Sequence, residues 1–100
     1  MKLNVKRKGS RVRFEIDGII DEQGAETLTK RFYELDTATV KELVLDFGNV
    51  GYICSAGVCK VLIFYKELTS NGSKLHIEND TGIVHEVFTF AKLNMVFSVN

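Results

Sequence analysis

Ser55 is the residue best placed to carry chemistry in this chain of 100 residues. It follows an apolar run at residues 43–47 and a short loop, and it precedes a long stretch with helical spacing. A serine in the first turn of a helix can satisfy a free backbone N–H group through its side-chain oxygen. The same helix end favours anions through its N–H groups and its dipole. The sequence therefore predicts at Ser55 either a plain N-cap or a phosphate acceptor in a favourable field.

The cysteines and histidines form no recognisable metal or redox site. Cys54 and Cys59 are five residues apart, so they make no CxxC motif and do not face each other on a helix. His76 and His85 lack the surrounding cysteines or carboxylates that metal ligation requires. We therefore expect two free thiols, no metal and no cofactor.

The chain also lacks a recognisable catalytic set. No nucleophile, histidine and acid can be placed together, and no GxxxxGK[ST] phosphate loop is present. Asp21 and Asp46 could approach Ser55 in the fold, but a carboxylate near a serine is not by itself catalytic. We interpret both as structural or recognition residues and expect no enzyme.

Composition indicates one globular domain over residues 1–100, with 45% hydrophobic residues. Thirteen Lys and Arg residues balance thirteen Asp and Glu residues, which argues against nucleic acid as the main partner. No run is long enough to span a bilayer, and no signal peptide is present, so we expect a cytoplasmic protein without membrane insertion.

Positive charge is concentrated at the start of the chain. The residues are Lys2, Lys6, Arg7, Lys8, Arg11 and Arg13. They form either a surface for an acidic partner or, as we favour, a charge barrier that keeps exposed strands from pairing edge to edge.

Residue patterns in the first half predict a hairpin followed by a helix. Residues 3–7 and 12–16 alternate as strands around a turn at Gly9 and Ser10, and residues 18–21 break the second strand. A helix is expected from near Gln23. Its apolar stripe consists of Ala25, Leu28, Phe32 and Leu35.

Residues 42–47 are mostly apolar, with Asp46 near the end of the run. Such a run is typical of a central strand buried on both faces. The helix that follows extends to Ser70. The residues predicted to face the sheet are Val58, Val61, Leu62, Tyr65 and Leu68. Ile63 falls on the far side, flanked by Cys59 and Phe64, so this side either contacts a neighbouring helix or binds a partner.

The last third predicts a strand at residues 74–77, a helix capped by Asp80 or Thr81, and a final strand at residues 95–99. That helix carries Ile83, Val84, Val87 and Phe88. The order β-β-α-β-α-β-α-β implies an α/β fold with a mixed, mostly parallel sheet of four to five strands and helices mainly on one face.

Several segments together resemble the STAS domain, found in sulfate-transporter C-termini and anti-sigma-factor antagonists. The family pattern is an apolar strand ending in Asp, a short hydrophobic loop, and Asp-Ser-Ser/Ala-Gly opening a helix. It is matched by residues 43–47, residues 50–53 and Ser55-Ala56-Gly57. Weaker similarities are Gly18-Ile19-Ile20-Asp21, Asn71-Gly72-Ser73-Lys74-Leu75 and Leu93-Asn94-Met95-Val96-Phe97.

The resemblance implies a bacterial regulator of transcription that docks on an anti-sigma factor, a serine kinase that phosphorylates it at Ser55. For this switch the Ser55 hydroxyl must be reachable and not sealed by Tyr52 or Phe47. The implied partner-binding residues are Ile20, Asp21, Tyr52, Cys54, Ser55, Ala56, Gly57, Val58, Cys59 and Ile63.

Two departures from the family pattern leave a second hypothesis open. Cys54 stands where the family usually has Asp, which removes a carboxylate beside the acceptor. The sequence also stops at Asn100 without the family's usual C-terminal helix, so a partner or a second copy, in a homodimer, would cover the exposed region. The alternative is a STAS scaffold subunit that is not phosphorylated, in a lipid-transport ABC system or a stress-signalling assembly.

Overall fold

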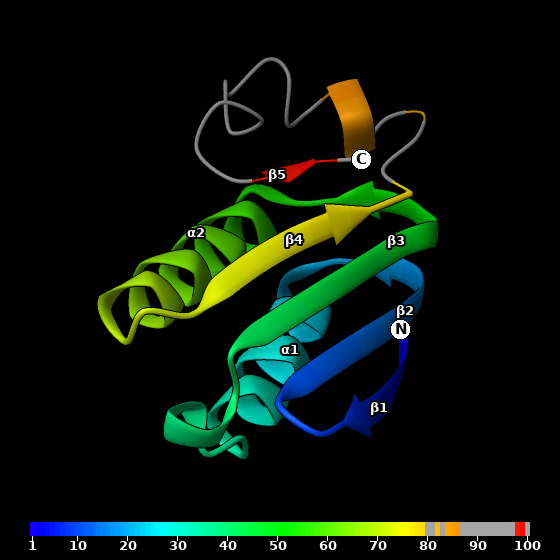
Figure 1. The fold of residues 1–100 in the computed structure, drawn as a ribbon. Helices are drawn as coiled ribbons and strands as arrows, with labels where there is room; N and C mark the ends of the chain where they lie inside the picture. Colours follow the sequence, from blue (N-terminus) through cyan, green and yellow to red (C-terminus); the bar gives the residue numbers. More distant parts are fainter. Residues whose placement is uncertain (80–81, 83, 87–97, 100) are drawn as a thin grey trace.

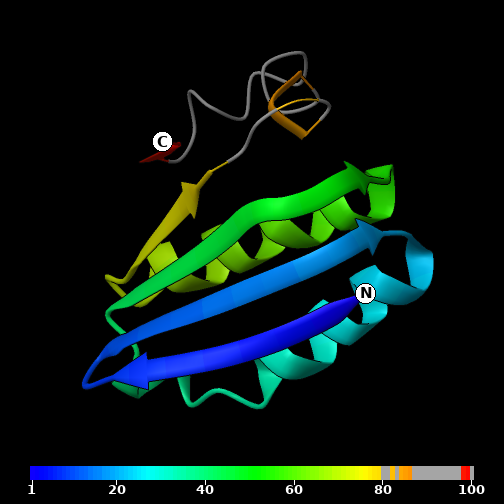
Figure 2. The same ribbon diagram turned by 90° about the vertical axis from the view of Figure 1, so that its right-hand side faces the viewer.

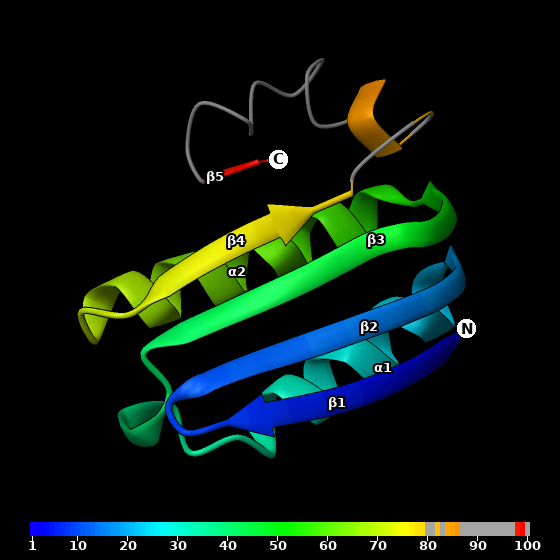
Figure 3. The ribbon, with the colours of Figure 1, turned by 45° about the vertical axis from the view of Figure 1, so that its right-hand side comes forward.

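The computed structural model describes residues 1–79, 82, 84–86 and 98–99. Its sheet has the strand order β1-β2-β3-β4-β5, with β1 antiparallel to β2 and the remaining neighbours parallel. The strands are β1 (Lys2–Lys8), β2 (Arg11–Ile20), β3 (Glu42–Ile53), β4 (Lys74–Glu78) and β5 (Ser98–Val99). Helices α1 (Glu22–Tyr33) and α2 (Ser55–Ser70) lie side by side on one face (Figures 1 and 3). This arrangement confirms the predicted fold class.

The core lies between the sheet and the two helices. Alternate residues of the strands face the helices, as the period of two along a strand requires. From the sheet, the buried residues include Val12, Phe14, Ile16, Leu43, Leu45, Phe47, Leu75 and Ile77. Phe32 of α1 and Phe64 of α2 stack with their ring centroids 4.2 Å apart, which joins the helices to each other as well as to the sheet.

Both central strands are longer than predicted. β2 does not break at residues 18–21 but continues to Ile20, because Gly18 adopts a φ of +103° and two register shifts take up the irregularity. β3 does not end at Phe47 but continues to Ile53, where it pairs with the extended end of β2. The predicted loop before Ser55 is therefore part of the sheet.

The face of α2 that is buried differs from the predicted one. The fully covered residues are Gly57, Val61, Phe64 and Leu68. Val58, Leu62 and Tyr65 are only partly buried beside them. Phe64, expected beside the far side of α2, stacks on Phe32 of α1, so this side contacts a neighbouring helix, as one of the two predicted alternatives has it. Val58, Leu62 and Tyr65 are less buried than predicted because α2 is apolar on several sides, and its spacing alone does not select one.

Helix α1 follows its prediction more closely. It begins at Glu22, and Ala25, Leu28 and Phe32 of the predicted stripe are buried. Leu35 lies beyond the helix end and is partly buried against the core. Neither this helix nor any other in the described part of the chain is long and apolar enough to cross a membrane.

Part of the predicted C-terminal third lies outside the described residues. Gly82 and residues 84–86 are helical, Val84 is buried, and Ser98 and Val99 pair with β4. The predictions for Asp80, Thr81, Ile83, Val87, Phe88 and residues 93–97 fall outside the described part.

Candidate functional site

The candidate site lies where β2 and β3 end and both helices begin. Ile20 and Ile53 are neighbours in the parallel register, and the Cys54 N–H group donates a hydrogen bond to the Ile20 carbonyl oxygen over 2.9 Å. Because each strand passes directly into a helix, the N-termini of α1 and α2 lie at the same edge of the sheet (Figure 3).

Cys54, not Ser55, is the N-cap of α2. Its backbone is extended (φ −81°, ψ 169°), and its Sγ accepts a hydrogen bond from the Gly57 N–H group over 3.4 Å. Ser55 is the first residue of the helix, and it is exposed. The predicted cap role of Ser55 was therefore wrong, because the cap is the last residue with extended geometry. Since Ser55 is itself exposed, neither Phe47 nor Tyr52 seals it.

Gly57 allows α2 to approach the ends of both strands. A Cβ atom at this position would lie 2.8 Å from Ile53 Cγ1 and 2.9 Å from Ile20 Cγ2. Both isoleucines are buried, so their side chains have little room to move. Of the predicted partner-binding residues, Ile20 and Gly57 thus support the site from inside and offer no surface to a partner.

An exposed apolar pair lies at the same ends of β2 and β3. Ile19 and Tyr52 are cross-strand neighbours, and they are exposed to 51% and 46% respectively. We call Ile19, Tyr52 and Ser55 the corner surface. Ile19 was not among the predicted site residues, although two consecutive isoleucines at a strand end must point to opposite faces.

The remaining predicted site residues lie along the first turns of α2. Cys59 and Ile63 are exposed and follow Ser55 at intervals of four, so the three share one side of the helix. Ala56 and Val58 are partly buried. Both cysteines are free thiols.

Asp21 has a structural task at the neighbouring helix. Its Oδ1 accepts a hydrogen bond from the Gly24 N–H group over 2.8 Å, which makes it the N-cap of α1. The residue itself is exposed, so it borders the site while holding the helix start.

Asp46 does not belong to the corner surface. Its neighbours Leu45 and Phe47 face the helices, so its carboxylate lies on the opposite face of the sheet. There it pairs with Arg13 at 2.7 Å, and Arg13 also pairs with Glu78 at 2.6 Å.

This ion-pair cluster shifts the pKa values of Asp46 and Arg13 in the direction that favours their charged forms. Burial works to raise the pKa of Asp46, but hydrogen bonds from Asn79, Gly48 and Arg13 outweigh it and hold the pKa below its usual value. The hydrogen bond to Glu78, together with contacts to Asp46, raises the pKa of Arg13. Asp46 is therefore committed to a structural cluster.

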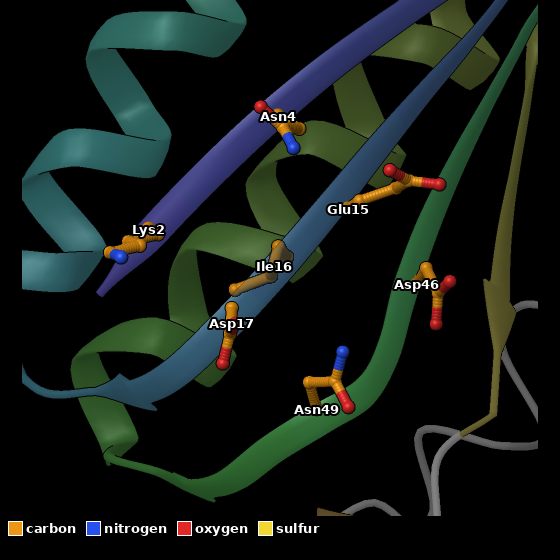
Figure 4. Close-up of a pocket in the computed structure, with 7 residues that line it drawn as sticks. All are labelled: Lys2, Asn4, Glu15, Ile16, Asp17, Asp46 and Asn49. Atoms are coloured by element: carbon orange, nitrogen blue, oxygen red, sulfur yellow. The ribbon is translucent and has the colours of Figure 1, made fainter.

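A pocket of about 310 Å³ adjoins this cluster on the open face of the sheet (Figure 4). It is lined by Lys2, Asn4, Glu15, Ile16, Asp17, Asp46 and Asn49. Among the described residues, no three His, Cys, Asp or Glu side chains are arranged to hold a metal ion.

Comparisons with known proteins agree with the fold. The family model described as STAS domain matches residues 2–100. A putative anti-sigma factor antagonist from Thermotoga maritima superimposes with a TM-score of 0.89 at 16% identity, covering 97% of this chain and 84% of that one. The phosphorylated form of SpoIIAA, a Bacillus cell fate determinant, gives 0.80 at 18% identity, covering 99% and 91%. A sulfate transporter family protein from Wolinella succinogenes gives 0.79 at 16% identity, covering 90% and 75%.

Proposed function

Because the chain belongs to the STAS domain family, we propose that it is a regulatory protein-binding module that is switched by phosphorylation of Ser55. Its partner would be an anti-sigma factor that acts as a serine kinase, as for an anti-sigma-factor antagonist. The observation that carries this proposal is the exposure of Ser55 in the first turn of α2, at the sheet edge where β2 and β3 end and where Ile19 and Tyr52 are also exposed.

Two opposing effects would make Ser55 a switch. A phosphate adds roughly −1.5 to −2 charges, and the N-terminus of α2 stabilises these charges in the free protein. In the complex the same charges would have to leave water beside Ile19 and Tyr52, which offer no compensating partner. Phosphorylation therefore leaves the fold intact and releases the partner.

The first experiment tests the acceptor. The protein is incubated with ATP and a serine kinase of the anti-sigma type from the same organism, and the products are analysed by mass spectrometry. We expect one phosphate on Ser55, none on Ser55→Ala, and normal labelling of Ser70→Ala, which removes an exposed serine at the other end of the same helix. Labelling elsewhere, or none, would overturn the switch.

The second experiment tests the consequence for binding. Ser55→Asp should weaken the complex with that kinase by at least about tenfold, since an unpaired charge must be desolvated at the contact. Ser70→Asp carries the same charge and should bind like the unchanged protein. Equal affinity of Ser55→Asp and the unchanged protein would contradict the proposal.

The observation that Cys54 replaces the family's aspartate favours a second candidate function. In this alternative the chain is a scaffold subunit that uses the corner surface for permanent assembly, in a lipid-transport ABC system or a stress-signalling complex. A stable complex that carries no phosphate on Ser55 after incubation with kinase and ATP would favour the scaffold.

A further inference from the structure

We propose that the free edge of β1 binds an extended acidic segment of another protein, which joins the sheet as an additional strand. This surface is distinct from the corner surface and does not depend on phosphorylation. β1 is the first strand in the sheet order, and all seven of its residues pair with β2 alone. Figure 2 shows β1 at the border of the sheet. The outward N–H and C=O groups of such an edge are a template for another strand.

The charge of this edge selects the kind of partner. Residues 1–14 contain six Lys and Arg residues and no acidic residue, whereas the rest of the chain contains thirteen acidic and seven basic residues. Within the described residues, Lys2 and Lys8 have no carboxylate partner, and Arg7 donates only to the neutral oxygens of Gly9 and Thr39. Lys6 pairs with Glu15 at 3.3 Å, but its side chain remains 68% exposed. Lys2 lies opposite Asp17 in the strand pair and near Glu15, so the excess of positive charge is concentrated at the hairpin end of β1, at Lys6, Arg7 and Lys8.

A groove of about 280 Å³ lies at the hairpin end of this edge. It is lined by Lys6, Arg7, Lys8, Arg11 and Arg13. Arg11 already pairs with Glu42 and Arg13 with Asp46 and Glu78, so the cationic groups left for an incoming carboxylate are those of Arg7, Lys8 and the largely exposed Lys6. The groove therefore offers a place for an acidic side chain of the added strand.

The two faces of β1 differ in a way that defines the sequence of the partner. Lys2, Lys6 and Lys8 alternate with Leu3 and Val5, which pack against the core but are only partly buried. A strand added beside β1 would cover the exposed parts of Leu3 and Val5 on one face and meet the lysines on the other. The matching segment alternates acidic and apolar residues.

The positive charges of β1 make other ligands of this strand edge less favourable. A second copy of β1 would bring lysine against lysine, and like charges directly opposite one another destabilise a strand pair. An anionic membrane or a nucleic acid would respond to the charge alone and has no peptide backbone to complete the edge. An acidic, extended polypeptide is the occupant that uses both features.

The test uses the full chain and a fluorescent peptide, acetylated and amidated, with the sequence Glu-Val-Glu-Val-Glu-Val-Glu. Fluorescence anisotropy should show saturable binding, and amide exchange measured by NMR should show new protection at alternate residues of β1. Lys6→Glu combined with Lys8→Glu should weaken binding by about tenfold or more, because attractive cross-strand pairs become repulsive. Lys60→Glu combined with Lys66→Glu makes the same charge change on α2 and should leave binding nearly unchanged.

Two control ligands separate strand addition from simple charge attraction. A peptide of the same composition with four Glu followed by three Val, and the alternating peptide N-methylated at every second residue, should both bind at least about tenfold more weakly, since one loses the facing pattern and the other its main-chain donors. Equal binding of all three peptides, or tighter binding of phosphatidylglycerol vesicles or single-stranded DNA, would overturn the proposal.

Discussion

The two helix N-termini at the corner begin with the same sequence pattern but different caps. α1 starts with Ile20-Asp21-Glu22-Gln23-Gly24, and α2 with Ile53-Cys54-Ser55-Ala56-Gly57. In α1 the cap is a carboxylate that accepts from the Gly24 N–H group over 2.8 Å. In α2 it is a sulfur that accepts from the Gly57 N–H group over 3.4 Å. A thiol is a weaker acceptor than a carboxylate, so the two helix starts are satisfied to different degrees.

This difference shows how one of two similar helix starts can be left open for function. At α1 an internal carboxylate already occupies the place where the helix attracts an anion. At α2 the cap is a cysteine, and the exposed Ser55 hydroxyl lies one residue further on. The N-terminus of α2 is therefore better suited to an added phosphate than that of α1.

The largest predicted loss of stability comes from removing the contact between the two helices, Phe32 stacked on Phe64. Phe64→Ala should destabilise the protein by about 3–5 kcal/mol, because Phe64 is fully buried and stacked on Phe32. Phe32→Ala should cost a similar amount, and the double variant less than the sum, because the two rings are each other's neighbours. Urea denaturation measures all three.

Leu62→Ala is the matched control for this contact. Leu62 is only partly buried, so its truncation should cost about 1 kcal/mol. A loss at Leu62 as large as that at Phe64 would show that α2 presents a different face to the sheet.

The second predicted change in stability differs between the two glycines that lie three residues after the caps, Gly24 in α1 and Gly57 in α2. Gly57→Ala should destabilise by about 1–2 kcal/mol, since the overpacking against Ile20 and Ile53 exceeds the gain in helix propensity. At Gly24 the nearest atoms to an added Cβ are 3.2–3.4 Å away and include the Met1 sulfur, so Gly24→Ala should be neutral or slightly stabilising. Thermal unfolding compares the two, and equal effects would contradict the close approach at Gly57.

The third predicted change in stability compares the N-caps of the two helices, Asp21 and Cys54. Asp21→Ala should cost about 1 kcal/mol, whereas Cys54→Ala should cost less than about 0.5 kcal/mol because the long sulfur contact contributes little. Cys54→Asp should stabilise by about 0.5–1 kcal/mol by giving α2 the cap that α1 has. If Cys54→Ala costs as much as Asp21→Ala in denaturant melts, the two caps are equivalent.

Sequence patterns were sufficient to predict the core residues of elements in which a single hydrophobic period selects one buried side. Alternation placed Val12, Phe14 and Ile16 in the core, and helical spacing placed Ala25, Leu28 and Phe32 there. α2 is apolar on several sides, so its spacing did not identify Phe64, and only the position of Phe32 on another helix does.

At the ends of β2 and β3 the sequence predicted some of the site residues but not the N-cap of α2 or the exposed pair Ile19 and Tyr52. The glycine in the first turn and the exposed serine followed from the family pattern, whereas the cap depends on whether the helix begins one residue earlier or later. The exposed pair of Ile19 and Tyr52 depends on two register shifts in β2 and on parallel pairing over a long sequence distance. The register shifts and the pairing leave no local signal in the sequence, whereas the Ile19-Ile20 doublet shows only that one of the two isoleucines must face outward.

The smallest predicted change in the free energy of unfolding is for substitutions of Ser55. Because Ser55 follows the cap, Ser55→Ala should change the free energy of unfolding by no more than about 0.5 kcal/mol. Ser55→Asp places a negative charge in the first turn and should stabilise by about 0.3–1 kcal/mol at low ionic strength, with the gain decreasing as salt screens the dipole. Thermal unfolding at low and high salt measures both.

In the background of Cys54→Asp the gain from Ser55→Asp should shrink or vanish, since two neighbouring carboxylates repel each other and share one helix end. The corresponding change in α1, Glu22→Gln, removes a charge beside an existing carboxylate cap and should alter stability by only a few tenths of a kcal/mol. A cost of about 1 kcal/mol for Ser55→Ala would identify the serine as a true cap. The two helix starts would then differ in position and not in chemistry, and the preference of α2 for an added charge would lose its structural basis.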